Sequence, residues 1–226
     1  MNRDIPHISI NPLTNFVGAT PAKKRSIIKE QKKVDMLKVF WYTTVKSTLP
    51  KYVKSGFDLT ILEDSVQHLR GFDQSTNNKK SNVVNSIYAI ESFIAMNFTT
   101  KLPSVHYHFY DKLEIKDYEL NGLLVRVTPD VVFDWVENGV KNIGAIKFHL
   151  GKSKALEPMT GRLRSSLICD FLCKTIAKND DFVNPQYCYC VDVFQGKAFS
   201  APTIITPDLI LLKESCREIN TLWNGI

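Results

Sequence analysis

Two strand-like segments joined by Asn138-Gly139 constrain the fold of this chain more than any other feature. A two-residue type I′ turn needs positive φ at both central positions, and Asn-Gly adopts that conformation readily. If Glu137 and Val140 close the turn, the antiparallel register places Asp130 directly opposite Lys147. The sequence therefore predicts a hairpin whose pairing is fixed from the turn outward.

Charged side chains interrupt these otherwise apolar strands, which are rich in Val, Ile and Phe. Side chains alternate along a strand, so Ala145, Lys147 and His149 share one face, and Asp130 on the partner strand belongs to the same face. A buried sheet face holds such groups only when something polar lies against them. We therefore expect a polar site at this end of the hairpin.

Length and composition favour one sizeable core. The chain has 226 residues, of which 44% are hydrophobic, and a formal net charge of +6. A basic balance favours a polyanionic partner. The first residues have no apolar leader pattern and no later stretch is apolar enough to span a membrane, so a soluble cytoplasmic protein without a membrane partner is expected.

The five cysteines come late in the chain and are odd in number, which predicts reduced thiols rather than a disulfide framework. A four-thiolate metal site is conceivable, but the spacings are not CxxC, and small buried apolar residues are the favoured interpretation. For His106 and His108, on one face of a short strand, packing or an exposed edge is favoured over a metal pair.

The remaining patterns predict helices flanking a mixed sheet. Residues 1–20 look irregular and residues 21–54 helical. Further helices are expected at 59–69, 81–97, 158–178 and from Thr206, with a polar loop at 71–82. Strands are expected at about 105–118, 122–136, 140–150 and on both sides of Gly196.

The expected helix at 81–97 carries a carboxylate among apolar residues. Val84, Ile87, Ile94 and Phe98 form one stripe, and Glu91 falls on it. A carboxylate on a buried helix face needs a cation, a backbone amide or a metal ion as its partner. We expect Glu91 to point toward Asp130.

The order of elements and the polar residues together resemble the PD-(D/E)XK nuclease superfamily, which includes restriction endonucleases. The matching residues are Pro129-Asp130, followed by Ala145, Ile146 and Lys147, and the resemblance covers residues 81–200. It implies a restriction endonuclease-like α/β fold with core order αβββαβ at 81–226, preceded by an N-terminal helical extension at 1–80.

The resemblance also implies roles for these residues. Asp130 and Glu91 would be metal ligands, Ile146 would contribute its backbone carbonyl, and Lys147 would be the catalytic lysine. The expected activity is DNA phosphodiester hydrolysis with Mg²⁺ or Mn²⁺ as cofactor.

Ala145 departs from the family pattern, because it stands where the second acid belongs. Three explanations are open. The acid has migrated to Glu91 or to Glu157; the site is naturally inactive and retained for binding; or the alanine is an engineered inactivation.

Four cations flank the expected site, namely Lys152, Lys154, Arg162 and Arg164. They are candidates for contacts with the DNA backbone, although solvated charges near a helix start explain them as well. The alternatives to a nuclease are a non-catalytic nucleic-acid-binding or assembly subunit, and an interaction protein that forms homo-oligomers or binds a partner through its N-terminal helices. The plainest alternative for Asp130 and Lys147 is a cross-strand ion pair.

Overall fold

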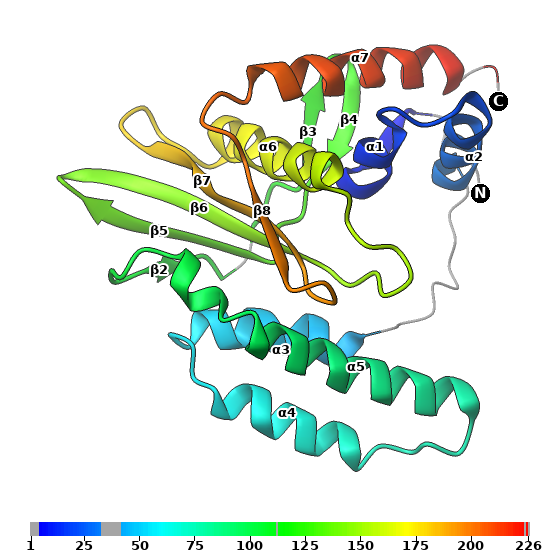
Figure 1. The fold of residues 1–226 in the computed structure, drawn as a ribbon. Helices are drawn as coiled ribbons and strands as arrows, with labels where there is room; N and C mark the ends of the chain where they lie inside the picture. The colour runs from blue at the N-terminus through cyan, green and yellow to red at the C-terminus, as the bar shows by residue number, and fades with distance from the viewer. Residues whose placement is uncertain (1–4, 33–41, 112, 224, 226) are drawn as a thin grey trace.

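A five-stranded mixed sheet runs through the middle of the molecule in the computed structural model (Figure 1), which describes residues 5–32, 42–111, 113–223 and 225. The strand order is β2-β5-β6-β7-β8. The β6 and β7 strands are parallel, and the other neighbours are antiparallel. The strands are β2 (His108–Phe109), β5 (Val131–Glu137), β6 (Val140–His149), β7 (Phe182–Asp192) and β8 (Lys197–Ser200).

A second, three-stranded sheet has the order β1-β4-β3. It consists of β1 (His7–Ser9), β3 (Asp117–Leu120) and β4 (Leu123–Arg126). The side chain of Asp117 receives two hydrogen bonds from the guanidinium of Arg126 at 2.8 and 2.7 Å. This bidentate pair lowers the pKa of Asp117 to about 2 and ties β3 to β4.

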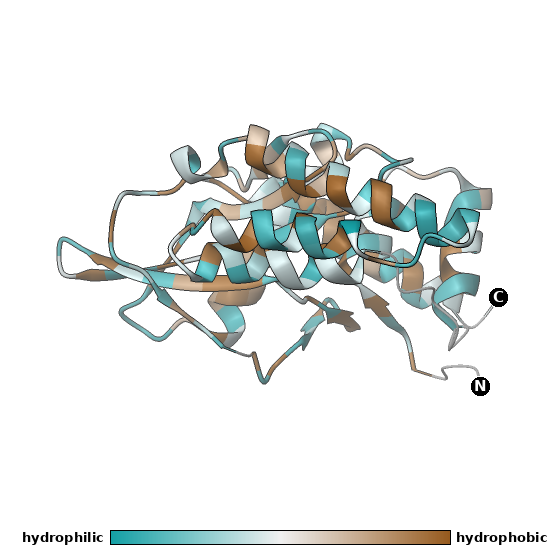
Figure 2. Ribbon diagram, turned by 90° about the horizontal axis from the view of Figure 1, so that it is seen from below, coloured by the Kyte–Doolittle hydropathy of each residue, from teal (hydrophilic) through white to brown (hydrophobic). Residues whose placement is uncertain are grey.

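Helices cover both faces of the larger sheet (Figure 1). One face carries α1 (Ile10–Phe16), α2 (Pro21–Lys32), α6 (Pro158–Thr175) and α7 (Thr206–Trp223). The other face carries α3 (Thr43–Lys54), α4 (Thr60–Arg70), α5 (Asn77–Ala95) and the short 3-10 helix η1 (Phe98–Lys101). Viewed from the side of α3, α4 and α5, hydrophilic and hydrophobic residues alternate around the helices (Figure 2), as expected where only one side of a helix is buried.

Two apolar clusters follow from the alternation of side chains along β5 and β6. Val132 and Ala145 belong to the first cluster, which includes residues of α1, α2, α6 and α7. Val131 and Ile146 belong to the second, which includes residues of α3, α4 and α5. The sheet therefore separates two cores, and the side of β6 that carries Ala145 faces α6.

The hairpin register agrees with the prediction. Asn138 and Gly139 have φ of 52° and 78°, Glu137 pairs with Val140, and Val132 pairs with Ala145. The predicted helices at 59–69 and 158–178 and the helix opened by Thr206 are present with small shifts of their ends. The chain is a mixed α/β protein.

The N-terminal region differs from the prediction of an irregular segment and one long helix. Ile10, Leu13 and Phe16 lie on one side of α1 and are buried, and Pro12 is tolerated because it lies in the first turn. The segment 21–54 contains two helices, α2 and α3. The predicted apolar stretch from Met36 to Trp41 lies outside the described residues.

Other boundaries also move. The expected strand at 122–136 is two strands in different sheets, since β4 ends at Arg126 and β5 begins at Val131 after Pro129. Most of the expected strand at 105–118 lies outside β2 and β3. Helix α5 begins at Asn77 and so crosses the boundary at residue 80. Residues of α1 and α2 lie in the same cluster as α6, so the first eighty residues do not form one separate helical layer.

None of the helices in the described part of the chain is both long enough and apolar enough to cross a bilayer.

Candidate functional site

Asp130 and Lys147 meet where the β5–β6 hairpin opens away from its turn. The Lys147 ammonium lies 3.7 Å from the Asp130 carboxylate and donates a 2.7 Å hydrogen bond to the carbonyl of Thr128. The Asp130 carboxylate accepts a 2.7 Å hydrogen bond from the backbone N–H of Phe148. The expected facing of Asp130 and Lys147 is confirmed.

Ala145 and Ile146, the two motif residues before Lys147, take part in core packing and in strand pairing, respectively. Ala145 has no exposed surface and lies in the first apolar cluster, paired with Val132 on one side and Cys188 on the other. The carbonyl of Ile146, expected to face a metal ion, accepts a 2.8 Å hydrogen bond from the backbone N–H of Asp130. The strands thus remain paired up to Asp130.

The prediction for Glu91 is wrong. The buried side of α5 carries Val83, Ser86, Ile90 and Phe93, whereas Glu91 is exposed. Helix α5 packs through Ile90 and Phe93 into the second cluster, opposite the face of the sheet that carries Lys147. The predicted buried face of α5 was displaced by one residue from the actual one, so the prediction assigned Glu91 to the core although it is exposed to solvent.

These residues do not fit a magnesium ion. Mg²⁺ takes a near-octahedral set of oxygen ligands, usually with one or two carboxylates. Here Asp130 brings one carboxylate, which already accepts a hydrogen bond from a backbone amide and lies close to Lys147. Across the described residues, no group of three or more His, Cys, Asp and Glu side chains is arranged to hold a metal ion.

Three hollows adjoin one another around the end of β6 and the loop after it. The first, of about 360 Å³, contains Asp130, Lys147, Asn11 of α1 and Lys46 of α3 in its lining. The second, of about 670 Å³, shares Lys46, Leu150 and Gly151 with the first. The third, of about 500 Å³, shares His149 with the first and Ser153 with the second.

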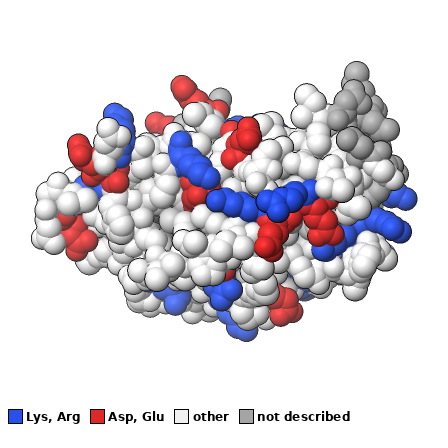
Figure 3. Space-filling view, turned by 90° about the horizontal axis from the view of Figure 1, so that it is seen from above, with Lys and Arg blue, Asp and Glu red and all other residues white. Residues whose placement is uncertain are grey.

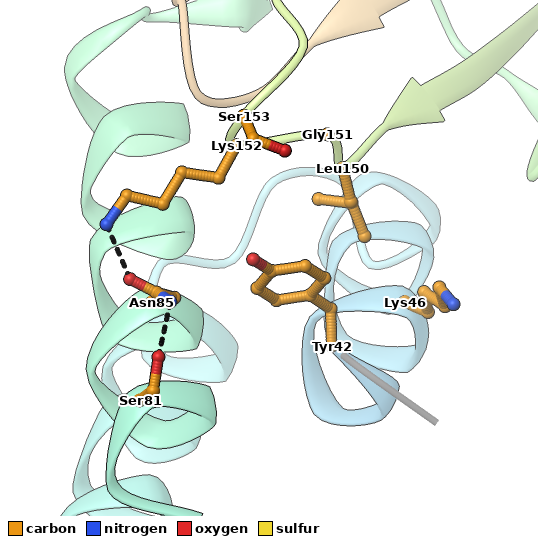
Figure 4. A pocket seen from close by; sticks show the side chains of 8 residues that line it. All are labelled: Tyr42, Lys46, Ser81, Asn85, Leu150, Gly151, Lys152 and Ser153. Carbon is orange, nitrogen blue, oxygen red and sulfur yellow. Dashed lines mark hydrogen bonds between the residues drawn. The ribbon is translucent and has the colours of Figure 1, made fainter. Parts of the chain in front are cut away.

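The second hollow combines an aromatic ring with cations (Figure 4). The ring of Tyr42 lies between Leu150 and the side of α5 that carries Ser81 and Asn85. Lys152 donates a 2.7 Å hydrogen bond to Asn85. Aromatic rings flanked by cations are a common means of holding nucleic-acid bases and their phosphates.

The four flanking cations divide into two pairs. Lys152 and Lys154 are exposed and line the second and third hollows, respectively, as expected for contacts with a polyanion. Arg162 instead lies 3.0 Å from Asp208 of α7. Arg164 is only 2% exposed, so the expectation of a surface cation is wrong for that residue.

Arg164 and His149 form a buried network with α1. The guanidinium donates hydrogen bonds to Thr14 at 3.0 Å and to Asn15 at 3.2 Å, and it lies 3.1 Å from Nδ1 of His149. Nε2 of His149 lies 2.9 Å from the carbonyl of Lys154. The neutral tautomer with the proton on Nε2 satisfies both contacts, and burial lowers the pKa of His149 in agreement with it.

Asp192 fixes the loop that borders the third hollow. It is fully buried, and its carboxylate accepts hydrogen bonds from the backbone N–H groups of Leu156 at 2.7 Å and Gln195 at 3.1 Å. Cys190 lies beside Lys147 in the sheet, and burial raises the pKa of its thiol to about 11. Asp192 escaped the sequence analysis, and Cys190 was considered there only as one of the five cysteines, although the alternation of the two along β7 follows that of Lys147 and His149 on β6.

Helix α1 supplies two more residues that the sequence analysis missed. Asn11 lines the first hollow and Asn15 the third. The spacing of Ile10, Leu13 and Phe16 was the signal for this helix, and it was overlooked because Pro12 and Gly18 indicated an irregular segment.

Among the described residues, the remaining metal candidates form no metal-binding group with Asp130. His106 is exposed, and His108 lies 3.2 Å from Asp134 with 71% of its side chain exposed. The five cysteines are free thiols, four of them buried. Glu157, a candidate for the displaced acid, is exposed and lines the third hollow, whereas Asp130 lines the first.

Charge is mixed on the face of the molecule seen from above, where α7 lies: Lys and Arg alternate with Asp and Glu there (Figure 3). This face therefore offers no uniformly basic surface.

No family model matches this chain, and no curated protein matches it either.

Proposed function

We propose that this chain binds a nucleic-acid strand, DNA by the resemblance, along the hollows at the end of β6, and does not hydrolyse it. The observation that carries this proposal is the unequal charge of the lining. The three hollows contain Lys23, Lys46, Lys147, Lys152, Lys154 and Arg164, whereas their acids are Asp130 and Glu157.

The chemistry of a nucleic-acid strand suits this lining. Lysines at separate points along a groove neutralise successive phosphates, and this term dominates non-specific affinity. Tyr42 offers a ring near Lys152 in the lining of the second hollow. If β3 and β4, which belong to the other sheet, are left aside, the order α5, β2, β5, β6, α6, β7 supports a restriction endonuclease-like core as the scaffold of these hollows.

Three features argue for binding rather than cleavage. The position of the second acid is a buried alanine, the Ile146 carbonyl is paired with Asp130, and Glu91 lies on a helix across the sheet. Because neither position 145 nor Glu91 supplies a second acid, Asp130 is a single carboxylate, and the positive charge of Lys147 offsets its negative charge.

Fluorescence anisotropy with labelled single- and double-stranded oligonucleotides, measured over a series of salt concentrations, tests the proposal. Lys46→Gln should weaken binding and reduce the slope of log affinity against log salt by about one. Lys51→Gln is the matched control, since Lys51 is an exposed lysine of the same helix that does not line these hollows. Equal effects of the two changes, or no oligonucleotide binding by the unchanged chain, would refute nucleic-acid binding along these hollows.

A metal-dependent DNA nuclease is the second candidate, because Asp130 and Lys147 do face each other as the resemblance implies. Incubation of supercoiled plasmid with the chain and Mg²⁺ or Mn²⁺ separates the two. Metal-dependent nicking that Lys147→Ala abolishes would establish hydrolysis, and an intact plasmid together with oligonucleotide binding would support the binding function.

A further inference from the structure

Arg164 is a buried cation that forms no ion pair with a carboxylate of the described residues. It is 2% exposed, and its polar contacts are the side chains of Thr14, Asn15 and His149, together with the thiol of Cys190. A buried charge is costly unless an opposite charge or several hydrogen bonds compensate it. The nearby acid Asp192 gives its two oxygens to backbone amides.

The guanidinium retains one donor for an incoming anion. An arginine has five N–H groups, one on Nε and two on each terminal nitrogen. Nε is directed at Thr14, one terminal nitrogen contacts His149 and the other contacts Asn15. Cys190 is a further hydrogen-bond partner of the guanidinium, so one N–H is left over, and it can donate a charge-assisted hydrogen bond to a phosphate oxygen.

The third hollow lies against this arginine and has the lining of an anion site. Lys23 and Lys154 border it as exposed cations, and Thr160 lies one turn before Arg164 on α6. Helix α6 begins at Pro158, so the positive end of its dipole is directed toward the same hollow. Glu157, the one acid of the lining, is exposed.

We propose that the third hollow is a phosphate-binding subsite with Arg164 at its base and Lys23 and Lys154 at its mouth. This inference deepens the proposed function, because a strand in the groove would place one of its phosphates there. The phosphate group is the recognised element, and it can come from a nucleic-acid strand or from a free phosphate compound.

Inorganic phosphate is the probe for the subsite, used in titration calorimetry and thermal unfolding with chloride at equal ionic strength as the reference. The unchanged chain should bind phosphate and unfold at a higher temperature in its presence. Arg164→Gln should weaken phosphate binding at least about tenfold, the effect of losing one hydrogen bond between charged groups. Arg162→Gln removes the same charge from the same helix outside the hollow and should retain binding.

Because Arg164 is buried, its replacement can disturb folding, so a second variant tests the subsite through exposed residues alone. Lys23→Ala combined with Lys154→Ala changes two exposed residues and should also weaken phosphate binding. Phosphate binding that is absent in the unchanged chain, or equal in the chain with both lysines replaced, overturns the subsite. Phosphate binding without oligonucleotide binding would keep the subsite, assign it to a free phosphate compound and refute the strand-binding function.

Discussion

The carboxylate of Asp130 is bound by the backbone N–H of Phe148 at 2.7 Å, so the acid of the motif caps the end of the hairpin. This hydrogen bond satisfies a backbone amide at the strand end and so stabilises the hairpin without a metal ion. The structure of the hairpin therefore gives Asp130 a structural role beside Lys147.

Asp130→Asn should strengthen oligonucleotide binding about threefold, because it removes a negative charge from a lysine-lined hollow at a partly exposed position. The amide oxygen can still accept from Phe148, so the free energy of unfolding should change by less than about 1 kcal/mol. Anisotropy titrations and urea denaturation measure both. Asp64→Asn on the exposed side of α4 is the control for net charge, and weaker binding by Asp130→Asn would contradict the charge argument.

Ala145→Glu should destabilise the fold by about 3 kcal/mol or more, because it buries a carboxylate in the first apolar cluster. On the sequence pattern alone the same change is expected to restore metal binding and cleavage. Urea denaturation and plasmid nicking with Mg²⁺ distinguish the two expectations. Val140→Glu, at a position 44% exposed on the same strand, should cost less than about 1 kcal/mol. A folded Ala145→Glu chain that nicks plasmid would favour the nuclease function over binding without cleavage.

Stability should fall as the pH drops below about 6.5, because burial lowers the pKa of His149 from that value in the folded protein. The unfolded chain then binds a proton that the folded chain excludes, so the contribution is complete above pH 6.5 and is lost toward lower pH. Arg164 and Lys147 oppose the protonation, whereas Asp192 and the carbonyl of Lys154 favour it.

The midpoint of urea unfolding between pH 5 and 7 measures this effect, since that range spans the titration of an ordinary histidine. His149→Gln should flatten the dependence, and replacement of the exposed His106 by Gln should leave it as it is. An unchanged pH profile in His149→Gln would show that the loss has another origin.

Gly161→Ala should destabilise the protein by about 1 to 3 kcal/mol, although alanine normally stabilises a helix relative to glycine. A Cβ at Gly161 would lie 2.5 Å from the ring of Phe199, because α6 packs closely on β8. Thermal unfolding measures the loss, and adding Phe199→Leu should recover part of it. Additive losses in the double variant would show that the clash is not the cause.

The sequence predicted best where a local rule fixes the geometry. Asn138-Gly139 set the hairpin register, and Thr206-Pro207-Asp208 marked the start of α7. The sequence predicted least well which face of a helix is buried when both faces carry apolar residues. Glu91 was placed among Val84 and Ile94, but those two residues are 52% and 39% exposed, so the apolar stripe used was the outer one.

The candidate site was predicted in part for the same reason. Asp130 and Lys147 follow from strand pairing, which is local. Arg164 could not be assigned to the interior, because its burial depends on α1, an element 150 residues earlier in the chain. No local sequence pattern in α6 predicts that contact, because Thr14 approaches the guanidinium only in the folded chain.

That separation has a consequence for biosynthesis. Ile10, Leu13 and Phe16 of α1 are buried in the cluster that contains α6 and α7, two helices that follow much later in the chain. A nascent chain therefore exposes an apolar helix until α6 and α7 have been translated, and closing so long a loop slows folding. Until α6 emerges, this first helix is a place where a chaperone can bind and where unfinished chains can aggregate.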